Sequence, residues 1–219
     1  MKRRYVYTLF QRFWHWTQAS LIITLAFTGF EVHGTYRVLG FELAARVHEY
    51  AAVALLVLVA FTIFWHLTTG GWRHYVPTSD GIIAQARYYT SGIFRNEPHP
   101  HKRTEISRLN PLQRLVYLGF KLLIFPVIAT SGLLYLFYSD FALSQQIGLA
   151  TIAFVHVAGA ILLLSFLLVH LYMNTTGHTL LSNLVTMITG WEELEEDHEE
   201  ADTGEEIAER KLGMEPGTD

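Results

Sequence analysis

Residues 147–172 read IGLATIAFVHVAGAILLLSFLLVHLY, an apolar run that contains no Asp, Glu, Lys or Arg. A helix needs about 20 mostly apolar residues to cross the ~30 Å hydrocarbon core of a bilayer. Three more stretches meet or approach that requirement, roughly Phe13 to Phe30, Ala44 to Leu67 and Leu115 to Tyr138. The pattern predicts an all-α membrane protein, a bundle of four transmembrane helices.

The composition agrees with a membrane protein. The chain has 219 residues, is 51% hydrophobic and carries only 16% charged residues, whereas soluble domains average roughly 25% charged residues. It has no cysteine, which excludes disulfides, iron–sulfur clusters, thiolate-ligated haem and covalently attached haem from this chain. Any haem must therefore be held non-covalently.

Basic residues are distributed unevenly along the chain. They concentrate before the first stretch and in the long connection between the second and third, namely Lys2, Arg3, Arg4, Arg12, Arg73, Arg87, Arg95, Lys102, Arg103, Arg108 and Arg114. Cytoplasmic segments of membrane proteins carry the excess of Lys and Arg. We therefore expect both termini and the loop at about 69–110 to face the cytoplasm.

The charge pattern also predicts two parts, a membrane domain at 1–190 and an acidic, disordered cytoplasmic tail at 191–219. Blocks of like charge are usually solvated, so a solubilising role for the tail is favoured over a docking peptide for a basic partner. Within the long loop, Asp80 to Phe94 has apolar residues at helical spacing. Such a segment can lie in the membrane interface.

Histidines in the membrane segments indicate function, because ionisable groups there are costly. Six of the eleven histidines lie in or at the ends of the predicted spans: His15, His33, His48, His66, His156 and His170. His156 and His170 are fourteen residues apart, which returns to within about 40° of the same helix face and separates them by ~21 Å. Two haems stacked across a membrane require ligands spaced in this way.

Chain direction supplies an opposing histidine at each depth. The first span runs outward and places His15 level with His170, while the second runs inward and places His48 level with His156. A bis-histidine haem needs one imidazole on each side of its iron. The sequence therefore predicts two non-covalent haem b groups, with the axial pairs His15/His170 and His48/His156.

Two histidines compete for these roles. His33 is eighteen residues from His15, and His66 is eighteen residues from His48, a rise of ~27 Å along a helix. We interpret His33 and His66 as rim residues that contact haem propionates or quinone, and His66 remains an alternative ligand in place of His15.

Glycines inside the spans have two open interpretations. Gly29, Gly132 and Gly159 permit the close approach either of a porphyrin or of a neighbouring helix. Pro126 predicts a kink in the third span, which has no histidine and is expected to form a wall of the haem sites.

Several motifs resemble the bacterial di-haem cytochrome b family, over roughly residues 8 to 180. They are Arg12-Phe13-Trp14-His15-Trp16, the lone His48, and the pair His156 and His170. The family comprises the cytochrome b subunits of formate dehydrogenase, nickel–iron hydrogenase and thiosulfate reductase, and small stand-alone quinol-oxidising cytochromes b. The thiosulfate reductase type is the most similar, on the segments Asn110–Arg114 (NPLQR) and Thr175–Thr179 (TTGHT).

The resemblance implies the same two ligand pairs and a quinone site, for menaquinone or ubiquinone, on the cytoplasmic side. Asn110 matches the family's quinone-contacting asparagine, and Gln113 and His66 are possible helpers. On chemistry alone, Asn110 ahead of Pro111 can equally cap the third helix.

The resemblance further implies a multi-pass protein of the bacterial inner membrane. We expect a membrane-anchoring di-haem subunit that transfers electrons between the quinone pool and a periplasmic redox partner. That partner would be a molybdenum/iron–sulfur enzyme, a hydrogenase or a multihaem cytochrome c, and no nucleic acid is involved. The alternatives are a stand-alone quinol-oxidising cytochrome b and, remotely, a haem-free membrane transporter or assembly factor.

Overall fold

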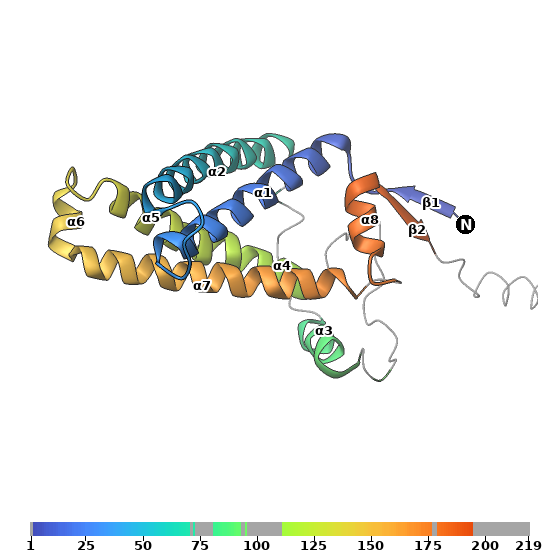
Figure 1. The fold of residues 1–219 in the computed structure, drawn as a ribbon. Helices are drawn as coiled ribbons and strands as arrows, with labels where there is room; N and C mark the ends of the chain where they lie inside the picture. Colours follow the sequence, from blue (N-terminus) through green and yellow to red (C-terminus); the bar gives the residue numbers. More distant parts are fainter. Residues whose placement is uncertain are drawn as a thin grey trace, which may run out of the picture.

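The computed structural model describes residues 2–70, 72, 81–92, 95, 111–176 and 179–194. The long helices are α1 (Leu9–Val32), α2 (Phe41–Thr69) and α7 (Leu149–Asn174), and a further helical segment is formed by α4 (Pro111–Gly119), η4 (Phe120–Ile124) and α5 (Phe125–Leu136). These segments run along the long axis of the molecule (Figure 1). All four predicted apolar stretches are therefore helical.

Within the described residues, three helical segments are long and apolar enough to cross a membrane: Phe41–Thr69, Leu112–Leu136 and Leu149–Asn174. Helix α1 is not among them, because Gln11, Arg12 and His15 make its first half more polar. Large side chains on the outward faces are exposed, as expected for helices that are apolar all round and face lipid.

The long helices pack as two hairpins. Helix α1 packs mainly on α2, and α5 packs mainly on α7. In the described part of the chain, neither helix of the first hairpin makes comparably close backbone contact with the second hairpin. Directly packed helices have axes 8–10 Å apart, so the two hairpins are held further apart than ordinary helix packing requires.

A buried carboxylate holds the connection between α1 and α2. Glu31 is only 4% exposed, and its Oε1 accepts hydrogen bonds from the backbone N–H groups of Val38, Leu39 and Gly40 at 2.8, 2.6 and 2.6 Å. Gly40 precedes the first residue of α2 and has a φ of 84°, a conformation that favours glycine. The carboxylate thus fixes the angle at which the chain enters α2.

The third long segment is irregular next to its proline. Pro126 has no backbone N–H and its ring crowds the carbonyl four residues earlier. A π-helical turn, η4, occupies Phe120–Ile124 immediately before α5. Since such turns accommodate an extra residue, the irregularity predicted at Pro126 takes the form of a π turn on its N-terminal side.

The two chain ends meet in a small sheet, at the end of the bundle where α1 begins (Figure 1). Strand β1 (Lys2–Tyr5) pairs antiparallel with β2 (Trp191–Leu194), which follows α8 (Ser182–Thr189). Ion pairs join facing residues, Arg3 with Glu193 at 3.0 Å and Arg4 with Glu192 at 2.7 Å.

This sheet differs from the prediction made from sequence, in which the chain is all-helical and Trp191–Leu194 belongs to the disordered tail. Cross-strand pairs of opposite charge stabilise such short strands, and this pairing becomes available only when the fold brings the two ends together. Residues 195–219 lie outside the described residues, so disorder there stays a prediction.

The long loop contains a short helix. Helix α3 (Ile82–Arg87) continues into the π turn η2 (Tyr88–Gly92), within the segment Asp80 to Phe94 that the spacing predicts to be helical. Gln85 on α3 is 1% exposed. At the other end of the bundle, the short helix α6 (Ala142–Ile147) connects α5 to α7.

Candidate functional site

Two imidazoles face each other between α2 and α7. His48 lies seven residues after the first residue of α2, and His156 lies seven residues after the first residue of α7. Their ring centroids are 6.3 Å apart, with an interplanar angle of 76°. The structure therefore brings together the two histidines that the depth argument placed opposite each other.

A second pair lies nearer the terminal sheet. His15 is six residues into α1, and His170 is four residues before the end of α7. Their ring centroids are also 6.3 Å apart, at an interplanar angle of 44°. Both predicted pairs are thus formed, fourteen residues apart along α7.

The separation of the rings fits a single iron between them. An imidazole nitrogen binds a first-row metal at about 2.0–2.1 Å, and it lies about 1.1–1.2 Å from the centre of its own ring, whose bonds are about 1.35 Å long. Two imidazoles on opposite sides of one iron would therefore have centroids about 6.2–6.6 Å apart. Both observed separations lie within this range.

Two further observations fit a flat macrocycle rather than a bare metal ion. Among the described residues, no group of three or more His, Asp or Glu side chains is arranged to hold a metal ion. A pair of imidazoles suffices for a haem iron, because the porphyrin supplies the remaining four nitrogens. The wide spacing of the two hairpins also suits a group inserted between them.

A hydroxyl group fixes the orientation of His48. The Thr28 hydroxyl, on α1, donates to the Thr24 carbonyl at 2.7 Å, and its oxygen lies 3.0 Å from Nδ1 of His48. Since that hydroxyl proton is already engaged, Nδ1–H of His48 donates to the Thr28 oxygen. The other nitrogen, Nε2, then carries the lone pair that a metal requires.

A hydroxyl group on α5 fixes the orientation of His156 in the same way. The Ser131 hydroxyl donates to the Val127 carbonyl at 2.7 Å, and its oxygen lies 3.2 Å from Nδ1 of His156. The Ile128 carbonyl, an acceptor only, lies 3.2 Å from the same nitrogen. Nδ1 is therefore protonated, and Nε2 is again the nitrogen available to a metal.

The His15–His170 pair has different partners. The Tyr117 hydroxyl lies 3.3 Å from Nδ1 of His170, whereas Nδ1 of His15 is buried and has no hydrogen-bond partner within the described residues. The Asn174 amide makes a long contact of 3.4 Å with Nε2 of His170. Iron binding at that nitrogen would displace this amide.

The glycines contact different neighbours. A Cβ atom at Gly29 would lie 3.3 Å from Cε1 of His48, and a Cβ atom at Gly132 would lie 3.1 Å from Cε1 of His156. A Cβ atom at Gly159 would instead lie 3.2 Å from Cβ of Ile128. Gly29 and Gly132 thus make room for imidazoles, while Gly159 serves the packing of α7 on α5.

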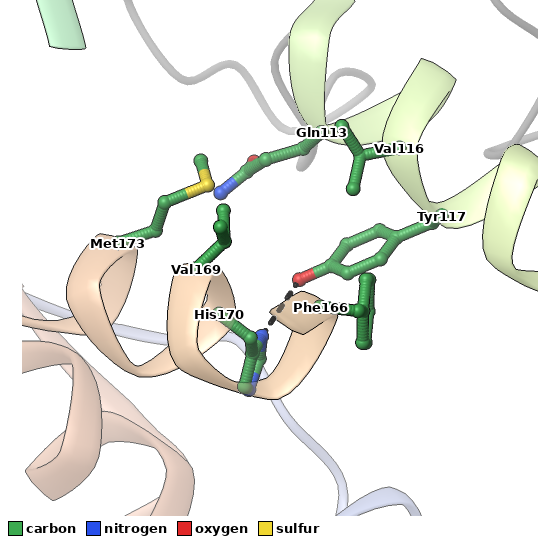
Figure 2. Close-up of a pocket in the computed structure, with 7 residues that line it drawn as sticks. All are labelled: Gln113, Val116, Tyr117, Phe166, Val169, His170 and Met173. Atoms are coloured by element: carbon green, nitrogen blue, oxygen red, sulfur yellow. Dashed lines mark hydrogen bonds between the residues drawn. The ribbon is translucent and has the colours of Figure 1, made fainter. Parts of the chain in front are cut away.

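A small pocket borders the His15–His170 pair. It is lined from α4 by Gln113, Val116 and Tyr117 and from α7 by Phe166, Val169, His170 and Met173 (Figure 2). The Tyr117 hydroxyl points toward His170 across this pocket (Figure 2). Gln113, predicted as a quinone contact, is therefore beside a predicted haem ligand, while Asn110 lies outside the described residues.

The two predicted rim histidines lie apart from the pocket lining. His66 donates from Nδ1 to the Thr62 carbonyl at 2.8 Å, and its ring centroid is 6.4 Å from that of Trp14. His33 is the exposed C-cap residue of α1.

Sequence reasoning missed Thr28, Ser131 and Tyr117. The dipeptides Thr28-Gly29 and Ser131-Gly132 were a possible signal, because the analysis noted each glycine without its neighbouring hydroxyl. Tyr117 gave no signal, since tyrosine is common near membrane interfaces.

The chain is similar in sequence to proteins described as cytochromes. The sequence model of the family described as "Prokaryotic cytochrome b561" matches residues 6–190. The chain is 29% identical over 204 residues to the protein of Escherichia coli (strain K12) named "Putative cytochrome YdhU", covering 85% of this chain and 74% of that one. No solved structure is significantly similar to the chain.

Proposed function

Because this membrane chain belongs to the prokaryotic cytochrome b561 family, we propose that it is the membrane-anchoring di-haem subunit of a quinone-linked oxidoreductase complex. Electrons would pass through it between the quinone pool and a periplasmic redox partner. The observation that carries the proposal is that two pairs of imidazoles, fourteen residues apart along α7, each have ring centroids 6.3 Å apart.

The proposed topology has four spans, with both termini in the cytoplasm. Helix α1 would be the fourth span, since it is 24 residues long and packs along α2. The pairing of β1 with β2 supports an even number of crossings, because it holds both ends of the described chain together. Basic residues near the N-terminus support the cytoplasmic side for that end.

The four histidines would hold two haem b groups. His48 and His156 would bind the outer iron, and His15 and His170 the inner iron. When bound, haem supplies one-electron transfer at its iron. Thr28 and Ser131 keep the outer imidazoles in the tautomer that presents Nε2, and Tyr117 faces the inner ligand His170.

Quinone would bind on the cytoplasmic side, near the inner pair. The pocket between α4 and α7 supports this site, because it brings Gln113 and Tyr117 next to His170. The Gln113 amide can donate a hydrogen bond to a quinone carbonyl. Asn110 would be a further contact, whereas His66 does not line this pocket.

The test is the haem content of the full chain purified in mild detergent. We expect a sharp b-type α-band after reduction with dithionite, and two haems per chain by pyridine haemochrome. His156→Ala should retain one haem, because an iron site that loses an axial imidazole binds more weakly, whereas His33→Ala, at an exposed position, should retain two. If His156→Ala still bound two haems, His156 would not be an axial ligand. If the protein purified without a second subunit, the stand-alone cytochrome would be favoured.

A further inference from the structure

The imidazoles of His48 and His156 have matching supports on two different hairpins. Nδ1 of each imidazole lies within hydrogen-bond distance of a hydroxyl residue that is followed directly by glycine in the sequence. These dipeptides are Thr28-Gly29 on α1 and Ser131-Gly132 on α5. Thr28 is 1% exposed and Ser131 is 4% exposed. Two buried hydroxyls and two glycines therefore surround one pair of opposed rings.

The hydroxyls act as acceptors toward the imidazoles. Each donates its own proton to a carbonyl four residues earlier in its helix, at 2.7 Å in both cases. This leaves a lone pair to accept Nδ1–H, at 3.0 Å for His48 and 3.2 Å for His156. The hydrogen-bond direction is thus the same on both sides of the pair.

The glycines make these hydrogen bonds possible. A Cβ atom at either position would come within 3.1–3.3 Å of an imidazole Cε1, which is closer than ordinary carbon contacts of ~3.5–4.0 Å. Any larger residue would push the ring away from its hydroxyl acceptor. Hydroxyl and glycine therefore form one unit, and we name each pair a cradle: Thr28-Gly29 and Ser131-Gly132.

We propose that the two cradles are positioning elements that lower the reduction potential of the haem bound by His48 and His156. This inference rests on the proposed function, because it requires a haem at that pair. Donation from Nδ1–H to an acceptor makes an imidazole a more basic ligand. A more basic axial ligand stabilises the ferric state relative to the ferrous state, so the potential falls.

The second histidine pair provides an internal reference. His15 has no acceptor at Nδ1 within the described residues, and His170 faces a tyrosine hydroxyl. Neither ring touches a cradle. Removing a cradle hydroxyl should therefore change one haem of the two.

The experiment is a redox titration of the α-band in the purified full chain and its variants. Thr28→Val preserves side-chain volume and removes the hydroxyl acceptor of His48. Ser131→Ala removes the hydroxyl acceptor of His156 but leaves the Ile128 carbonyl 3.2 Å from the same nitrogen, so its effect should be the smaller of the two. We expect each to raise the midpoint potential of one component, leave the other unchanged, and keep two haems per chain. Thr28→Ser should restore the native potential. The component that shifts should be the one absent from His156→Ala.

Matched controls remove a hydroxyl that bonds only to its own helix. Thr24 donates to the Ser20 carbonyl and Thr130 to the Pro126 carbonyl, so Thr24→Val and Thr130→Val should leave both potentials unchanged. Unshifted potentials in Thr28→Val and Ser131→Ala, with both haems bound, would overturn the proposal. If Thr28→Val does not insert, Ser131→Ala decides alone. Wild-type protein without haem would instead contradict the proposed function.

Discussion

Gly132 provides a direct steric test of the site. In the structure, a methyl group at this position would lie 3.1 Å from Cε1 of His156. Ordinary van der Waals contact begins at about 3.4 Å, so Gly132→Ala should displace the imidazole by about 0.3 Å or more. Metal–ligand distances tolerate only about ±0.2 Å, and the displaced ring should therefore bind the iron of the proposed outer haem poorly.

Substitutions at two other glycines provide comparisons for this prediction. At Gly29 the corresponding distance to His48 is 3.3 Å, which implies a smaller shift of about 0.1 Å or more. At Gly159 the added atom would lie 3.2 Å from Ile128 and no imidazole is involved. All three substitutions overpack the bundle, at a cost of about 1–3 kcal/mol, but only the first two move a ligand.

The assay is the haem-to-chain ratio by pyridine haemochrome, measured together with thermal stability in detergent. We expect the ratio to fall toward one in Gly132→Ala, to fall less in Gly29→Ala, and to stay at two in Gly159→Ala. Equal ratios in Gly132→Ala and Gly159→Ala, at similar loss of stability, would refute the steric reasoning.

Two further predictions concern other parts of the molecule. Tyr117→Phe keeps the ring but removes the hydroxyl 3.3 Å from Nδ1 of His170. In a redox titration, the reduction potential of the proposed inner haem should therefore shift while that of the outer haem stays unchanged. A shift of the outer component alone would contradict this assignment. Glu31→Ala leaves three part-buried backbone donors without their acceptor. An unsatisfied buried donor costs about 1–3 kcal/mol, and because solvent can reach the exposed residues Val38 and Leu39, we expect a total loss of stability of about 1–3 kcal/mol. Thermal unfolding would measure it, with Glu31→Gln, which keeps an acceptor oxygen, as the control that should lose less.

Hydrophobic patterning and helix periodicity account for much of what could be anticipated. The four apolar stretches are helical, and the positions of His156 and His170 on α7 follow from 3.6 residues per turn. Chain direction then predicted that His15 would face His170 and that His48 would face His156, and the rings of each pair do lie close together. These properties depend on local sequence alone, because a membrane helix must satisfy its backbone hydrogen bonds internally.

The supports of the imidazoles could not be anticipated in this way. Thr28 contacts His48, which is twenty residues later in the sequence, and Ser131 contacts His156, which is twenty-five residues later. Such contacts depend on how one helix is rotated about its axis relative to the next. Hydropathy does not fix that rotation, since these helices are apolar on every side. The role of each glycine was ambiguous for the same reason.

The sequence by itself determined the helical segments and the apolar character of the chain, and it predicted which histidines would face each other. Only the tertiary structure decided that the rings meet 6.3 Å apart, that hydroxyls accept their Nδ1 protons, and that the chain ends pair as a sheet. The physical reason is range: helix formation and membrane insertion depend on neighbouring residues, whereas hydrogen-bond geometry depends on how distant helices are turned toward each other.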